Sequence, residues 1–71
     1  MVQRKFNLKM MEVKTPIANL RKLPDQNSNL ETQLLFGEEI EIISEGKKDW
    51  LLCKSVKDNY EGWIKKNNIG K

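Results

Sequence analysis

The side chains that could perform chemistry are few in this sequence of 71 residues. It contains no histidine, and Cys53 is its single cysteine. These counts exclude a nucleophile paired with histidine, a zinc site of cysteine and histidine ligands, and an intramolecular disulfide. Carboxylate or lysine chemistry would need a cleft deep enough to shift pKa values, which a domain of this size rarely has. We therefore expect no catalytic residue, no metal site and no cofactor.

Charge is distributed unevenly along the chain. The formal net charge is +3, yet residues 24–46 carry six acids and no base, while the segments on either side are basic. Nucleic-acid-binding domains gather Lys and Arg into a stripe with aromatic residues between them, whereas the longest basic runs here are pairs. The pattern therefore favours an ordinary solvated surface.

The apolar residues follow the two-residue period of β-strands. Ile40 and Ile42 share one face of a strand, and Glu39 and Glu41 take the other. Short strands at close spacing, joined by tight turns, indicate a small β-barrel or sandwich. Strands are predicted at Met11–Thr15, Gln33–Phe36, Ile40–Ile43, Trp50–Val56 and Tyr60–Ile64, with a terminal turn at Asn67–Gly70.

Three segments have the composition of turns or loops. Glu45–Asp49 is predicted to be a hairpin turn in which Gly46 takes a positive φ. Lys57–Asn59 is the next predicted turn, because Asp and Asn tolerate left-handed backbone. The polar stretch within Leu23–Leu30 is predicted to be a loop, since apolar strand residues resume directly after it.

Length and composition limit the chain to one small domain. Apolar residues make up 38% and charged residues 32%, as in soluble globular domains. No apolar run approaches the ~18 residues that a spanning helix needs, so no membrane span is expected. Residues 1–10 show no clear pattern and no secretory signal, and are predicted to be a flexible N-terminal arm before a barrel domain at 11–71.

Five ordered segments carry a further pattern, namely Ala18–Arg21, Pro24–Asp25, Leu30–Glu38, Asp49–Cys53 and Asp58–Ile64. In this order and spacing they resemble the bacterial SH3 (SH3b) domain. The likeness covers residues 13–69 and is closest to the SH3b domain that precedes NlpC/P60 cysteine peptidase domains in cell-wall enzymes.

The resemblance implies an all-β, SH3-like, partly open barrel of five to six short strands with a long RT-type loop, which we assign to Leu23–Leu30. It also implies a neighbouring domain that cuts cell-wall peptide with a catalytic cysteine and histidine, machinery that this chain lacks. Cys53 falls where the family has a small aliphatic residue, so we interpret it as a buried core thiol, with a reactive or partner-linking thiol as the alternative.

The resemblance also points to candidate ligand-binding residues. In SH3-type folds a tryptophan at the position of Trp50 lies beside the long loop and floors a groove. Together with Asp25 and Glu31 it would hold a peptide carrying an amine, through its ring face and charge-assisted hydrogen bonds. Trp63 either leans outward to join such a site or folds over the end of the barrel. Tyr60 is a further candidate, although a core position is favoured for it.

Three binding roles remain open at this point. The first is a non-catalytic module that recognises peptidoglycan stem peptide or positions an NlpC/P60 peptidase domain on it. The second is an SH3-like protein–protein adaptor, which lacks the groove tyrosines that proline-rich ligands require. The third is a small basic barrel that binds nucleic acid, against which the acidic segment 24–46 argues. The family resemblance suggests the bacterial cell envelope, although no export signal is visible.

Overall fold

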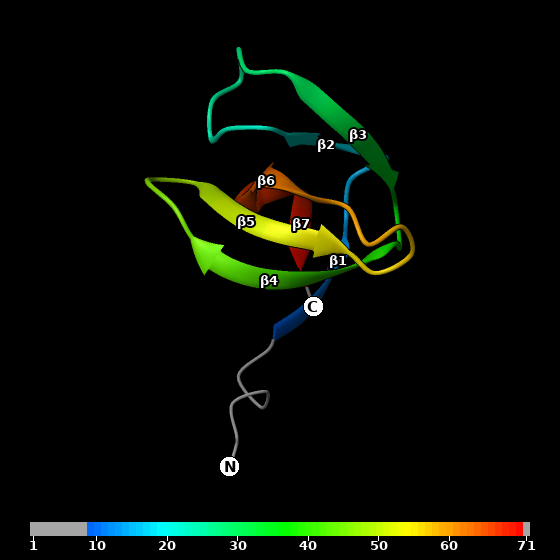
Figure 1. Ribbon diagram of the computed structural model, residues 1–71. Coiled ribbons are helices and arrows are strands. Elements are labelled where there is room, and N and C mark those ends of the chain that lie inside the picture. The colour runs from blue at the N-terminus through cyan, green and yellow to red at the C-terminus, as the bar shows by residue number, and fades with distance from the viewer. Residues whose placement is uncertain (1–8, 71) are drawn as a thin grey trace.

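The computed structural model describes residues 9–70, in which seven strands form one antiparallel sheet (Figure 1). The order of strands across the sheet is β3-β2-β6-β5-β4-β1-β7. The sheet curls so that β2 and β3 lie above β4 and β5 in Figure 1, but the edge strands β3 and β7 do not pair with each other. The expected all-β, partly open architecture is confirmed. The elements are β1 (Lys9–Val13), β2 (Ile17–Arg21), β3 (Leu30–Leu35), β4 (Glu39–Glu45), β5 (Trp50–Ser55), β6 (Glu61–Lys65), the 3-10 helix η2 (Lys66–Asn68) and β7 (Ile69–Gly70).

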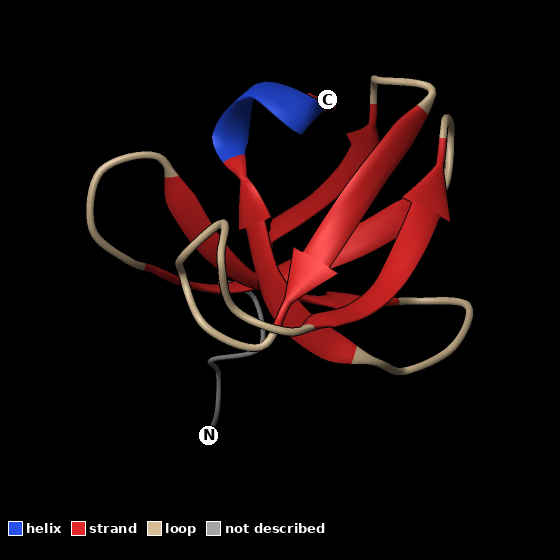
Figure 2. Ribbon diagram, turned by 90° about the horizontal axis from the view of Figure 1, so that it is seen from above, coloured by secondary structure: helices blue, strands red, loops and turns tan. Residues whose placement is uncertain are grey.

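Two of these strands were not expected from the sequence. Most of β2 was recognised in the sequence only as the segment Ala18–Arg21 of the family pattern, without a strand assignment. The predicted terminal turn consists of the end of η2 followed by β7. Figure 2 shows η2 as a single helical turn beside the C-terminal end. Ile69 pairs with Val13 across the sheet, a long-range contact that local composition does not reveal. β1 begins at Lys9, and the remainder of the expected arm, residues 1–8, lies outside the described residues.

The core lies on the inner faces of the strands and follows the predicted two-residue period. On β5, Leu51, Cys53 and Ser55 are buried, while the residues between them are only half-buried. Each apolar side chain removed from water stabilises the fold by about 1.5–3 kcal/mol. The buried apolar residues are Val13, Ala18, Leu20, Leu34, Ile40, Leu51, Cys53 and Ile64.

The turn predictions are confirmed in place but not in every detail. Asn59 has a φ of 60°, as expected for the turn at Lys57–Asn59. The prediction that Gly46 takes a positive φ is wrong, because Lys48 is the left-handed residue of that turn, with a φ of 52°. Gly46 has a different role, since a Cβ at its position would lie 2.5 Å from Cζ3 of Trp63. Close approach of the indole ring therefore requires a glycine at this position.

The predicted long loop is confirmed as residues 22–29, between β2 and β3. Its ends are joined by a hydrogen bond from Lys22 N to Asn29 O (2.9 Å). Within it, Ser28 Oγ accepts a hydrogen bond from Leu23 N (3.2 Å) and lies 2.9 Å from Asp25 O. These internal hydrogen bonds give the loop a defined shape, and in Figure 1 it projects on the same side as the turn between β4 and β5.

Candidate functional site

A groove of about 310 Å³ lies on the outer face of the sheet, where β2 and β6 diverge. The two strands pair only at Arg21 and Trp63, so the sheet opens on one side of that pair. We call this hollow the Trp50 groove. Its lining consists of Ile17, Asn19 and Arg21 from β2, Gln26 from the long loop, Trp50 from β5, Lys65 from β6, and Asn67 and Asn68 from η2.

Strand alternation places these side chains on the outer face. Leu51 and Cys53 are buried, so Trp50 points to the opposite side of β5. On β2 the buried Ala18 and Leu20 leave the other positions facing outward. The groove is therefore made from positions that the core does not need.

Trp50 and Lys65 are partners in the register of β5 and β6. The Lys65 ammonium lies 5.4 Å from the centroid of the Trp50 ring, within the range of a cation–π interaction. Both residues are half-buried. The Lys65 ammonium thus lies over the ring, and the groove opens beside this pair.

Arg21 connects the groove to the long loop. Its Nη1 donates a hydrogen bond to Ser28 O (3.1 Å), which ties the loop to β2 and brings Gln26 to the groove. Beside it, Asn19 Oδ1 accepts a hydrogen bond from Gln33 Nε2 (2.9 Å), so the Asn19 amide group is left to donate. Arg21 and Asn19 are therefore anchored by other parts of the protein.

The expected acids lie elsewhere. Asp25 uses Oδ1 to accept a hydrogen bond from Asn27 N (2.9 Å) within its own loop. Glu31 Oε1 accepts a hydrogen bond from Tyr60 Oη (3.3 Å). Neither acid lines the Trp50 groove. The structure therefore brings Glu31 to Tyr60, and not to the tryptophan.

Tyr60 is 42% exposed, so the favoured core position is wrong for this residue. The β5–β6 ladder ends at Lys54 and Glu61, and beyond it the alternation no longer directs Tyr60 inward. Tyr60 lies five residues before Lys65, which is the cross-strand partner of Trp50. Five residues of a strand span about 16 Å, so Tyr60 lies well away from Trp50. The pair of Tyr60 and Glu31 is thus a separate surface feature.

Trp63 leans outward from β6 and is half-buried. Its cross-strand partner is Leu52, and its ring reaches Gly46 at the far side of β5. The ring therefore crosses the outer face of β5 and covers it, and Trp63 does not line the Trp50 groove. This contact between β6 and the β4–β5 turn depends on the strand order, which sequence patterns do not contain.

Cys53 is confirmed as a buried core thiol, with no exposed surface. Burial raises the pKa of its thiol to about 12, because the apolar surroundings disfavour the thiolate. A thiol in this state is a poor nucleophile near neutral pH. Among residues 9–70, no three carboxylate or thiol side chains gather in a group that could hold a metal ion.

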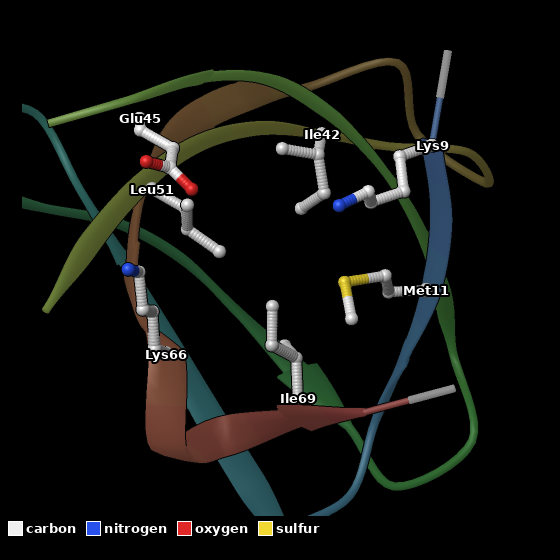
Figure 3. A pocket seen from close by; sticks show the side chains of 7 residues that line it. All are labelled: Lys9, Met11, Ile42, Glu45, Leu51, Lys66 and Ile69. Carbon is white, nitrogen blue, oxygen red and sulfur yellow. The ribbon is translucent and has the colours of Figure 1, made fainter. Parts of the chain in front are cut away.

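A second hollow, of about 260 Å³, opens between β1, β4, β5 and β7, and we call it the mouth pocket. The side chains of Met11, Ile42, Leu51 and Ile69 point into it in Figure 3, with charged groups near its edge. Three of these four, all except Leu51, are partly buried residues that pack against the core. The charged residues of its lining are Lys9, Glu45 and Lys66.

The lining of the Trp50 groove was mostly missed by sequence reasoning. Recognition of Ile17–Arg21 as a strand would have placed Asn19 and Arg21 on its outer face by alternation alone. No local signal could have added Gln26 or Asn67, because their positions depend on how the loop and η2 fold back.

Comparison with known proteins agrees with this architecture. The sequence profile of the family described as "Bacterial dipeptidyl-peptidase Sh3 domain" matches residues 20–69. A protein named Dipeptidyl-peptidase 6 from Lysinibacillus sphaericus is 34% identical over 53 residues, which cover 75% of this chain and 19% of that protein. The chain thus aligns with about a fifth of this relative's length. No solved structure matches significantly.

Within residues 9–70, no helix has the length and apolar character needed to cross a membrane.

Proposed function

We propose that this chain, which belongs to the family of bacterial dipeptidyl-peptidase SH3 domains, acts as a non-catalytic module that binds peptide in the Trp50 groove. The observation that carries the proposal is the groove itself, in which one aromatic ring lies among polar side chains, two of them anchored by hydrogen bonds. Sites for small ligands and peptides commonly combine an apolar surface with a few convergent polar groups. The absence of histidine and the buried thiol of Cys53 support a role in binding and not in catalysis.

The proposed ligand is the stem peptide of peptidoglycan. Support comes from the name of the Lysinibacillus sphaericus relative, a dipeptidyl-peptidase, and from the resemblance to SH3b domains of cell-wall enzymes. An extended peptide would lay one side chain or backbone segment on the ring of Trp50. Its carbonyl groups would accept hydrogen bonds from the carboxamides along the groove, including Asn19 and Asn67. In this role the module holds cell-wall peptide for a peptidase domain.

A ¹⁵N-HSQC titration with the synthetic stem tripeptide L-Ala-γ-D-Glu-L-Lys tests this proposal. We expect localised shifts of the Trp50 indole and of residues 17–21 and 65–68, with the remainder of the spectrum unchanged. Trp50→Ala should abolish the shifts while keeping a folded spectrum, and Trp63→Phe is the control because Trp63 lies outside the groove. An unchanged spectrum at millimolar peptide would contradict peptide binding by this domain.

A second function is favoured by an exposed apolar cluster at one end of β2 and β3. Ile17 and Leu35 are cross-strand partners that are 52% and 56% exposed, and Phe36 next to them is 65% exposed. β3 is an edge strand, so this surface is open to a partner. The proposed partner is a peptidase domain in the same polypeptide, because the Lysinibacillus sphaericus relative extends far beyond the matched segment.

The two functions differ in what each substitution changes. If the cluster docks a peptidase domain, adding the remaining part of the relative as a separate protein should shift Leu35 and Phe36. Leu35→Glu should remove that interaction and leave any peptide binding in the groove intact. Ile17 belongs to both surfaces, so Leu35 and Phe36 are the residues that distinguish them. Unchanged signals of Leu35 and Phe36 would contradict docking through this cluster.

A further inference from the structure

The charged residues of the Trp50 groove are both cations. We infer that the groove recognises a carboxylate of its ligand, held between Arg21 and Lys65. The inference rests on the proposed peptide-binding function and specifies the chemical group that is recognised.

Among residues 9–70, neither cation has a carboxylate partner. The ion pair found among residues 9–70 joins Lys14 to Glu12 at 3.2 Å, outside the groove. Arg21 and Lys65 are both half-buried, so each has lost part of its hydration. Within the described residues each has gained only an uncharged partner, Ser28 O for Arg21 and the Trp50 ring for Lys65. Charge-assisted hydrogen bonds to a bound anion would compensate for that loss.

The sheet register brings the two cations to the same hollow. Arg21 pairs with Trp63, and Lys65 lies two residues further along β6 on the same face. Such diagonal neighbours are separated by roughly 7–8 Å, a span that long side chains bridge readily. One guanidinium nitrogen of Arg21 is committed to Ser28 O, which fixes the group and leaves its other donors for a ligand.

The other polar groups of the lining suit an acceptor as well. They are carboxamides, and the amide group of Asn19 is left to donate because its oxygen is bound by Gln33. The acids that the sequence placed beside Trp50 are bound to Asn27 and Tyr60 outside the groove. The amine-binding site expected from the sequence would need carboxylates here, and the groove has none.

Two forms of one probe test the inference, namely L-Ala-γ-D-Glu-L-Lys with free carboxylates and the same tripeptide with both carboxylates amidated. Each is titrated by NMR at about 50 mM NaCl, where exposed charges are weakly screened. We expect the free acid to bind at least tenfold more tightly than the amide, with shifts at Arg21 Nε and the Trp50 indole. Lys65→Gln should weaken binding of the free acid about tenfold and leave that of the amide unchanged, which corresponds to the usual net strength of a charged hydrogen bond.

The controls separate the charge from the fold. Lys54→Gln removes a half-buried lysine from the outer face of β5 without touching the groove, and should bind both peptides as the wild type does. Lys65→Arg keeps the cation and should keep the preference for the free acid. Equal binding of acid and amide with shifts in the groove would overturn carboxylate recognition and leave peptide binding standing. Failure of both peptides to bind would overturn the proposed function and this inference with it.

Discussion

The Trp50 groove and the mouth pocket have similar volumes, about 310 and 260 Å³, and both include charged side chains, but the remaining residues of their linings differ. Charged and carboxamide side chains surround a single aromatic ring in the groove. Four apolar side chains line the mouth pocket, and three of them also pack against the core. The mouth pocket is thus the uncovered end of the hydrophobic core, while the groove lies wholly on the outer face.

β5 contributes to both hollows through adjacent residues. Leu51 points inward to the core and the mouth pocket, and Trp50 points outward to the groove. The two faces of β5 therefore have different roles. The inner face stabilises the fold, and the outer face is available for binding. Substitutions on either side should therefore have separable effects.

The largest expected effect is on the inner face. Leu51→Ala should lower the free energy of unfolding by about 2–4 kcal/mol, because it removes a side chain that is only 6% exposed and leaves a cavity. Leu52→Ala, on the outer face, should cost about 1 kcal/mol or less. Denaturant unfolding of both variants measures the difference, and equal costs would contradict the division between the faces.

Cys53 provides a pH-dependent test of the same inner face. Its pKa is about 12 in the folded protein, against 9.0 for an ordinary thiol, so between these values the unfolded chain releases a proton that the folded chain keeps. The stability contribution of the thiol is complete below pH 9.0 and is lost as the pH rises toward 12, by about 1.4 kcal/mol per pH unit. Stability measured between pH 9 and 11 should fall less steeply in Cys53→Ala. Parallel curves for the two proteins would show that the thiol is not buried as described.

Gly46 tests the packing that covers the outer face. Gly46→Ala should destabilise the domain by about 1–2 kcal/mol, because the new Cβ would lie 2.5 Å from Cζ3 of Trp63. In a Trp63→Leu background the same substitution should cost less, since the ring is absent. A double-mutant cycle measures this coupling, and additive costs would indicate that the ring does not rest on Gly46.

The smallest effect on stability is expected at the groove. Trp50→Ala should cost about 1 kcal/mol or less, because it removes a half-buried ring and one cation–π contact with Lys65. It should nevertheless weaken binding of the stem tripeptide more than tenfold. Met11→Ala in the mouth pocket should do the opposite, with a clear loss of stability and unchanged binding. Loss of binding in Met11→Ala alone would place the ligand site in the mouth pocket instead.

Much of the fold was predictable from the chain itself. The alternation around Ile40 and the break at the polar loop follow from local patterns, because strand geometry sends successive side chains to opposite faces. The same rule accounts for the outward direction of Trp50. The buried position of Cys53 was implied by the resemblance to the SH3b family. The exclusion of histidine-dependent chemistry needed only the composition.

The site could not be predicted in the same way, since its members meet only through long-range pairing. The β5–β6 register places Lys65 beside Trp50, and the β2–β6 contact at Arg21 and Trp63 brings Arg21 to the same groove, where the sequence analysis expected acids. Tyr60 is exposed because it lies just outside the β5–β6 ladder, whose last pair at this end joins Lys54 and Glu61. The sequence by itself thus determined which face each strand residue takes, a local property of the backbone. Only the tertiary structure decided which of those residues share a surface, because that depends on strand order and register across the whole chain.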